Sequence, residues 1–213
     1  MGGRRSPARS GRPPAGRIEC AIDRPAAAPR GLAIACHPHP QFGGTLDNKV
    51  VQTIARACLD LGWACVRFNF RGVGASEGVW DEGRGEVDDA LAVAAHWRGR
   101  PEFAGLPYLL GCFSFGGYVA VEAAHRLGAG DPPRRIVLIG PSTEKQAVAR
   151  VPPDTLVIHG ESDDVVPLAA TLAWAKPQNL PVIVFPGVGH FFHGQIALLK
   201  KVIVRELHDL AAV

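Results

Sequence analysis

Residues 107–117 read PYLLGCFSFGG, and this stretch decides the fold that we expect. Its apolar first half predicts a buried strand at 107–113, and the small residues after Ser114 predict a helix that begins near Gly116. A serine at a sharp turn between a strand and a helix is the arrangement of a nucleophile elbow, G-x-S-x-G. Cys112 replaces the first glycine, which is a mild departure because cysteine is also small. The other interpretation of Ser114 is a helix cap.

Apolar runs of strand length alternate with helical patterns along the rest of the chain. Strands that are apolar on both alternations are typical of a sheet covered on both faces, and alternation with helices predicts a mainly parallel, doubly wound α/β sheet. We expect one domain over residues 17–213, with its active site at the carboxyl ends of the strands. The expected strands are residues 17–22, 31–36, 63–70, 107–113, 135–139, 155–159 and 181–185, and the expected helices are residues 48–61, 86–97, 116–127, 167–175 and 196–210.

Charge is distributed unevenly along the chain. Residues 1–30 contain seven arginines and two acidic residues, whereas the remaining 183 residues carry 16 basic and 18 acidic side chains. The folded part is therefore slightly acidic, and a nucleic-acid groove is not indicated. We expect residues 1–16 to be a basic, disordered tail; an early start codon, an address signal and a contact with an anionic surface are the alternatives. The chain has no apolar run long enough for a transmembrane helix, and the tail lacks the apolar core of a secretory signal.

The cysteines and two of the histidines are the residues that could indicate metal binding or redox chemistry. The five cysteines have no C-x-x-C spacing and four lie in apolar runs, so we expect buried thiols and a cytoplasmic location. His37 and His39 could suggest a metal site, but no third ligand of suitable spacing accompanies them. We expect neither a metal nor another cofactor, and we expect these histidines to bond the loop backbone.

A candidate catalytic acid follows the strand at 155–159. Residues 154–167, DTLVIHGESDDVVP, place Asp163 and Asp164 in the loop after that strand. A serine hydrolase needs a carboxylate to orient its imidazole. We favour Asp163, although spacing alone leaves Asp164 open, and two solvated loop acids are the other interpretation.

A candidate catalytic base follows the last expected strand. Residues 181–193, PVIVFPGVGHFFH, present His190 on a glycine-spaced loop from which an imidazole can reach a serine. His193 is the competing candidate, and a core histidine bonded to backbone is the other interpretation of His190. Serine, aspartate and histidine then occur in the chain order of α/β-hydrolases, each after a different strand. We expect Ser114, Asp163 and His190 to form a catalytic triad.

Residues 36–45, CHPHPQFGGT, lie where this fold places half of its oxyanion hole. Two prolines in the segment have no N–H to donate. Gln41 has the first free N–H after the second proline, so we expect it to be one donor, with Phe42 as the alternative. The second expected donor is Phe115, the residue after the nucleophile.

Five segments resemble those of small bacterial α/β-hydrolases of the "predicted hydrolase" group, which are related to dienelactone hydrolases and carboxylesterases. The resemblance covers about residues 17–213 and implies that Ser114, Asp163 and His190 are the triad, so it favours Asp163 over Asp164. Dienelactone hydrolases proper resemble the chain less, because they have cysteine where this sequence has serine. The segments are CHPHPQFGGT (36–45), RFNFRGVGASEG (67–78), GCFSFGG (111–117), HGESDDVVP (159–167) and PGVGHFFHG (186–194).

The short connection at residues 141–154 cannot form a cap domain, so we expect an open cleft without a lid. Phe42, Phe113 and Phe191 are the aromatic candidates for substrate contacts. We expect a serine carboxylesterase that cleaves short- to medium-chain small-molecule esters through an acyl-enzyme, with no nucleic-acid or membrane partner. A thioesterase, lactonase or polyester hydrolase with the same triad is an alternative, as is a non-catalytic scaffold. The sequence does not indicate an oligomeric state.

Overall fold

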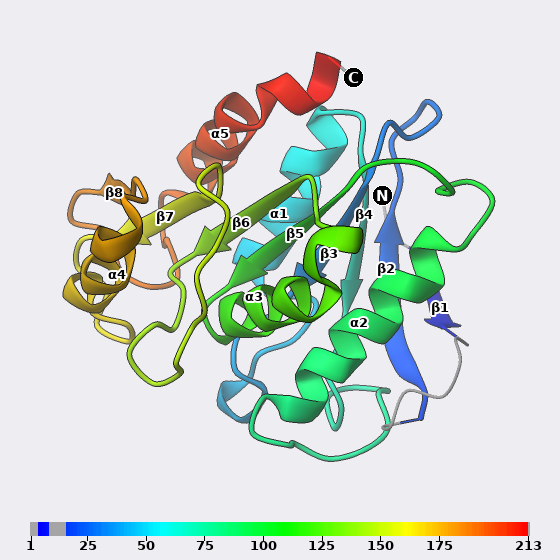
Figure 1. The fold of residues 1–213 in the computed structure, drawn as a ribbon, viewed down its shortest axis with the longest axis horizontal. Coiled ribbons are helices and arrows are strands. Elements are labelled where there is room, and N and C mark those ends of the chain that lie inside the picture. The colour runs from blue at the N-terminus through cyan, green and yellow to red at the C-terminus, as the bar shows by residue number, and fades with distance from the viewer. Residues whose placement is uncertain (1–3, 9–15, 213) are drawn as a thin grey trace.

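The computed structural model describes residues 4–8 and 16–212, with a β-sheet through the middle (Figure 1). Its strands are β1 (Arg4–Ala8), β2 (Ile18–Asp23), β3 (Leu32–Cys36), β4 (Ala64–Phe68), β5 (Tyr108–Phe113), β6 (Arg135–Ile139), β7 (Leu156–Gly160) and β8 (Ile183–Phe185). They lie in the order β1-β2-β4-β3-β5-β6-β7-β8. The strands from β3 to β8 run parallel, whereas β2 pairs antiparallel with both β1 and β4.

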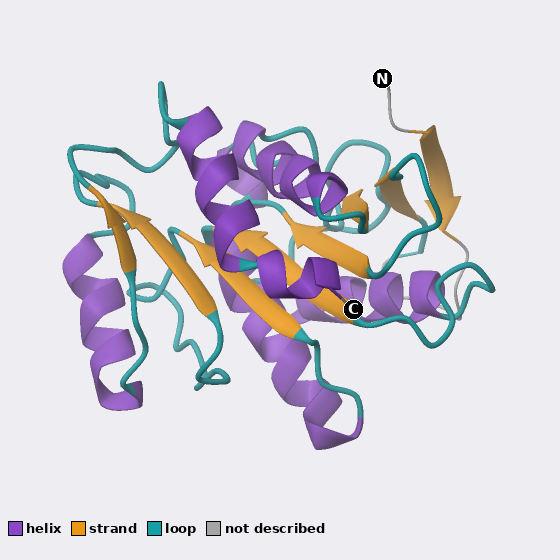
Figure 2. Cartoon of the chain, turned by 90° about the horizontal axis from the view of Figure 1, so that it is seen from above, coloured by secondary structure: helices purple, strands orange, loops and turns teal. Residues whose placement is uncertain are grey.

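Helices cover both faces of this sheet (Figure 2). One face is covered by α1 (Lys49–Asp60) and α5 (Ile196–Glu206), and the other by α2 (Arg84–Arg98), α3 (Phe115–Leu127) and α4 (Leu168–Ala175) (Figure 1). Four short 3-10 helices complete the described elements: η1 (Pro40–Phe42), η2 (Gly128–Gly130), η3 (Lys176–Gln178) and η4 (His208–Ala212).

Strand β5 shows why the strands are apolar at both their odd and their even positions. All of its side chains are buried. Leu110 and Cys112 pack into the core beneath α2 and α3, whereas Leu109 and Phe113 pack into the core beneath α1 and α5. Successive side chains of a strand point to opposite faces, so a strand between two helical layers needs apolar residues at every position.

The predicted doubly wound α/β architecture is confirmed, with differences in the expected tail and at the ends of several elements. Arg4–Ala8, in the expected tail, form β1 and pair with β2; the rest of that tail, residues 1–3 and 9–15, lies outside the described residues. Strand β4 ends at Phe68 instead of residue 70. The Asn69 N–H still donates to the Glu19 carbonyl of β2, whereas the Phe70 N–H leaves the sheet and donates to the His37 imidazole.

The connection from β6 to β7 begins at the carboxyl ends of the parallel strands. Residues 140–155, which connect β6 to β7, form neither a helix nor a strand, so the described chain has no cap domain over this edge, as predicted. The five cysteines are free and buried, in agreement with their apolar neighbours. None of the helices in the described part of the chain has the length and apolar character that a membrane crossing requires.

Candidate active site

Ser114 occupies a strained turn between β5 and α3. Its backbone has φ 55° and ψ −122°, a conformation that residues with a side chain rarely adopt. Its N–H donates to the Ile139 carbonyl at 2.9 Å and its carbonyl accepts from Gly117, which holds the turn in place. The serine side chain makes no capping bond to the helix, so the cap interpretation is not supported and the geometry is that of a nucleophile elbow.

Glycine is required at position 116 by the close approach of α3 to the loop after β3. A Cβ on Gly116 would lie 2.5 Å from the carbonyl oxygen of Cys36 and 2.6 Å from that of His37. Such contacts are with rigid backbone, so any side chain there would push the helix away from the loop. The glycine therefore brings the N-terminus of α3 and the loop at 37–40 together around Ser114.

His190 and Asp163 form a buried pair next to this turn. His190 Nδ1 lies 2.6 Å from Asp163 Oδ2, and both side chains are almost fully buried. Asp163 Oδ1 accepts from the N–H groups of Val165 (3.0 Å) and Val166 (2.7 Å). Asp164, the alternative acid, is exposed, so it is Asp163 that the structure places beside His190.

Asp163 is kept ionised by its hydrogen bonds. Burial raises the pKa of this carboxyl, but bonds from His190 and from the N–H of Val166 outweigh the cost of burial and lower the pKa below its usual value. An ionised acceptor at Oδ2 fixes His190 with its proton on Nδ1, which leaves Nε2 free to act as a base.

Two neighbours set the position of the His190 ring. The ring of Phe113 lies against it with centroids 4.7 Å apart. Gly140, at the end of β6, has φ 49°, and a Cβ there would lie 3.3 Å from the His190 ring and 3.5 Å from Asp163 Oδ2. Gly140 therefore gives the acid–base pair its space, a role that our sequence analysis missed; its signal is a glycine directly after a buried strand.

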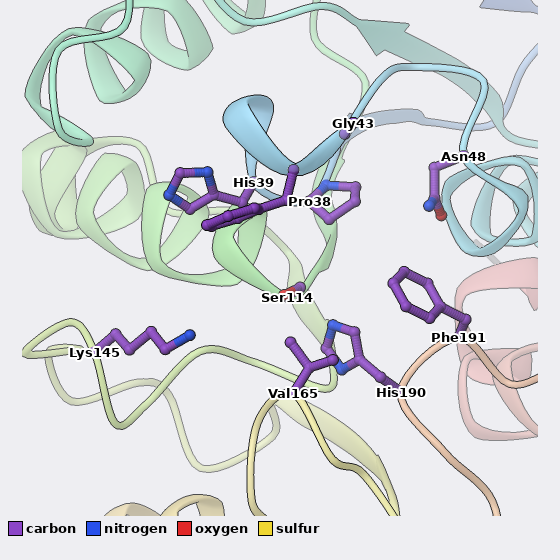
Figure 3. Close-up of a pocket in the computed structure, with 11 residues that line it drawn as sticks. Pro38, His39, Gly43, Asn48, Ser114, Lys145, Val165, His190 and Phe191 are labelled. Carbon is purple, nitrogen blue, oxygen red and sulfur yellow. The ribbon is translucent and has the colours of Figure 1, made fainter.

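Ser114 and His190 line one cavity of about 350 Å³ at the carboxyl edge of the sheet. Figure 3 shows the His190 ring beside Ser114, with one ring nitrogen turned toward the serine. His193, the competing histidine, is absent from the described lining of this cavity; it lines a second hollow, which His190 and Phe191 also line. The remaining lining residues are Pro38, His39, Phe42, Gly43, Gly44, Asn48, Lys145, Val165 and Phe191.

Two of the three aromatic residues expected to contact substrate lie in the wall of the cavity. Phe42 and Phe191 line the cavity, and both are exposed. Phe113 is fully buried beneath the site and does not reach it, so its assignment as a substrate contact is corrected. Its position on β5 turns it toward the core, where it supports the His190 ring.

The N–H groups that we expected in the oxyanion hole are already engaged. Gln41 N–H donates to His39 Nδ1 at 3.3 Å, and Phe42 N–H donates to the His39 carbonyl at 3.1 Å. Gln41 is exposed and is absent from the described cavity lining. The assignment of Gln41, with Phe42 as its alternative, is therefore corrected, because the 3-10 turn η1 uses both donors internally.

Two other N–H groups remain available beside Ser114. Among the described residues no group accepts the N–H of His39, which lines the cavity. Phe115 begins α3, so its N–H has no acceptor within the helix. The sequence had indicated Phe115, whereas His39 was missed because proline spacing does not show which N–H groups a 3-10 turn engages.

His37 holds the loop at 37–40 against the end of β4. Its Nδ1 lies 2.6 Å from the Pro38 carbonyl, and its Nε2 accepts the Phe70 N–H at 3.0 Å. Burial lowers the pKa of this imidazole to about 4, so the ring is neutral at pH 7. The expectation that His37 and His39 bond the loop backbone is confirmed by these contacts and by the Gln41 bond to His39.

This neutral histidine predicts a loss of stability in acid. The pKa of His37 falls from 6.5 to about 4 on folding, so between these values the unfolded chain binds more protons at this site. The contribution of the neutral His37 ring to the free energy of unfolding is therefore complete above pH 6.5 and is lost as the pH falls toward 4. Between pH 7 and about pH 4.5, the free energy of unfolding of the wild type should fall by about 2 kcal/mol more than that of His37→Gln. Urea unfolding at the two pH values measures this difference, and equal losses would contradict the assignment.

No protein-family model matches the chain, but a curated protein is similar to part of it. An uncharacterized protein of Rickettsia prowazekii (strain Madrid E) is 38% identical over 113 residues, which are 53% of this chain and 47% of that protein. This chain thus spans about half the length of the curated relative that it matches.

Solved structures match nearly end to end. An α/β serine hydrolase without a lid from Xanthomonas campestris has a TM-score of 0.87 and 34% identity, over 98% of this chain and 95% of that one. An α/β serine hydrolase homologue from Coxiella burnetii has a TM-score of 0.86 and 34% identity, over 97% of this chain and 98% of that one. Such identity along almost the whole of both chains reflects common descent as well as common architecture, and the chain belongs to the α/β serine hydrolases.

Proposed function

We propose that this serine hydrolase is a carboxylesterase that works through an acyl-enzyme, with Ser114 as nucleophile, His190 as base and Asp163 as the acid that orients it. The observation that carries the proposal is the strained Ser114 at the cavity, beside an imidazole whose other nitrogen is bonded to a buried carboxylate. Strained non-glycine residues cluster at active sites.

In the first half of the reaction, Ser114 Oγ attacks the ester carbonyl carbon while His190 Nε2 accepts the hydroxyl proton. The carbonyl oxygen becomes an oxyanion, which the free N–H groups of His39 and Phe115 stabilise; each such donor contributes about 3 kcal/mol. The tetrahedral intermediate collapses, the C–O bond of the ester breaks, and His190 returns the proton to the leaving alcohol.

In the second half, water replaces the alcohol. His190 Nε2 accepts a proton from water as its oxygen attacks the acyl carbon, and the same two N–H groups stabilise the second oxyanion. Collapse breaks the acyl–Oγ bond, and His190 returns the proton to Ser114. Asp163 stabilises the imidazolium that forms in each half without taking its proton.

The cavity suggests the size of the acyl group. A volume of about 350 Å³ with walls made largely by Phe42, Val165, Phe191 and Pro38 suits a short- or medium-chain acyl group. The site has no lid in the described chain, so long lipid chains would remain largely in water.

Kinetics on p-nitrophenyl esters test the proposal. We expect a burst of p-nitrophenol equal to the enzyme concentration, turnover that is highest for acyl chains of about four to eight carbons, and labelling by a fluorophosphonate that depends on Ser114. A thioester and a lactone measured in parallel establish whether the ester is the preferred acyl donor. Absence of both a burst and a label would contradict the proposal and favour a non-catalytic scaffold.

A further inference from the structure

The cavity beside Ser114 has one permanently charged side chain in its described lining, that of Lys145. Lys145 belongs to the connection between β6 and β7, and Figure 3 shows its amine reaching from that loop toward Ser114. Phe191 and Asn48 lie on the other side of the serine in the same view. A substrate bound across Ser114 would therefore extend toward an ammonium group on one side only.

The ammonium of Lys145 is available to a ligand. In the described part of the chain, Lys145 has no carboxylate partner, whereas Lys200 forms an ion pair with Asp60. His39 does not share the charge, because burial and the nearby Lys145 lower the pKa of its imidazole. Lys145 is itself exposed to solvent, and apolar residues make up most of the remaining wall, so no other permanently charged side chain of the described lining competes with it for an anionic group.

We propose that Lys145 binds an anionic group of the substrate, so that this site prefers esters that carry a carboxylate on an otherwise apolar arm. This inference rests on the proposed esterase function and specifies its substrate class. The carboxylate accepts charge-assisted hydrogen bonds from the Lys145 amine while the ester carbonyl lies against Ser114.

The test compares two esters of equal chain length, mono-p-nitrophenyl adipate and p-nitrophenyl hexanoate. We expect the ratio of kcat/KM for the adipate to that for the hexanoate to fall about tenfold in Lys145→Met and further in Lys145→Glu. The ratio should also fall with added NaCl in the wild type, because salt screens the attraction. Lys201→Met, an exposed lysine of α5 outside the cavity lining, is the matched control and should keep the wild-type ratio.

The outcomes separate this inference from the function on which it rests. An unchanged ratio in both Lys145 variants, with both esters still cleaved, overturns the substrate class alone. Failure of the wild type to cleave either ester overturns the proposed esterase and the inference together.

An independent observation concerns His159, the second imidazole at the Asp163 carboxylate. His159 lies at the end of β7 and is fully buried. Its Nε2 is 2.9 Å from the Val166 carbonyl and 3.4 Å from Asp163 Oδ2. Its Nδ1 is buried with no hydrogen-bond partner in the described structure.

These contacts fix the protonation state of His159. Nε2 must carry the proton, because the Val166 carbonyl can only accept. A second proton on Nδ1 would be buried without an acceptor, so the ring stays neutral. Asp163 Oδ2 is thus placed between two imidazoles, of which only His190 can become cationic without burying an unpaired N–H.

The geometry points to His159 as a positioning residue for the acid of the triad. From β7 it donates to the Val166 carbonyl and lies close to Asp163 Oδ2, and so holds the turn that keeps the carboxylate in line with His190 Nδ1. The Val166 N–H in turn donates to Asp163 Oδ1, so hydrogen bonds hold the turn at 163–166 through both the N–H and the carbonyl of Val166.

Two substitutions test this role. His159→Phe keeps a ring but loses the donor, and we expect kcat to fall about 10- to 100-fold with little change in KM. His159→Gln restores a donor near the position of Nε2 and should recover most of kcat. Similar thermal unfolding of the two variants together with different kcat values supports positioning. Equal kcat in both variants, or a loss that appears only in KM, overturns it.

Discussion

Replacing Ser114 by alanine should reduce ester turnover by about 10⁴-fold or more, because the attacking oxygen is lost while the cavity and the N–H groups remain. The burst and the fluorophosphonate label should both disappear. Ser162→Ala is the control: this serine is exposed in the loop beside Asp163 and should leave turnover within about twofold of the wild type. Turnover of Ser114→Ala near the wild-type rate would refute the nucleophile.

The same position allows a test that does not depend on activity. At φ 55° and ψ −122° a side chain strains the backbone, and glycine relieves that strain. Ser114→Gly should therefore be inactive yet more stable than Ser114→Ala, by about 1–3 kcal/mol in the free energy of unfolding. Urea unfolding of the two variants measures this difference. Equal stability would show that the turn stores no strain, and would remove the physical basis for calling it a nucleophile elbow.

The sequence predicted those parts of the site that depend on local pattern. A buried strand, a small-residue turn and a helix start are encoded within 107–117, so Ser114 could be placed without a structure. Asp163 and His190 follow strands in the same way, and parallel strands bring their carboxyl ends to one edge. Ser114 and His190 were therefore predicted from separate local patterns, whereas spacing left Asp164 open beside Asp163 and the family resemblance favoured Asp163.

The parts that the sequence did not predict depend on which neighbour occupies a given space. Proline spacing indicated Gln41, but the capping bond to His39 Nδ1 exists only once η1 has folded. Phe113 was expected to contact substrate, but strand alternation turns it into the core. His159 resembles an ordinary strand residue until β7 and the turn at 163–166 are seen together.

Asp89 anchors the long loop between β4 and α2 through a buried ion pair. Its side chain is fully buried and accepts from Arg71 Nε at 3.0 Å, Arg71 Nη2 at 2.8 Å and the Arg71 backbone N–H at 3.0 Å. Arg71 Nη2 also donates to the Gly85 carbonyl at 2.6 Å. Arg71 follows Phe70, whose N–H is bonded to His37. The Arg71–Asp89 ion pair therefore also helps to hold the loop at 37–40 in place.

Asp89→Ala should lower the free energy of unfolding by about 3–5 kcal/mol, because it leaves the nearly buried Arg71 guanidinium without its counter-ion. Asp88→Ala is a closely matched control on the same helix: Asp88 pairs with Arg126 at the surface, and its loss should cost less than about 1 kcal/mol. Urea unfolding at pH 7 measures both. If Asp89→Ala is too unstable to purify, the double variant Arg71→Met/Asp89→Leu removes both charges and should recover much of the stability. Equal losses for Asp88→Ala and Asp89→Ala would show that the buried pair does not anchor the loop.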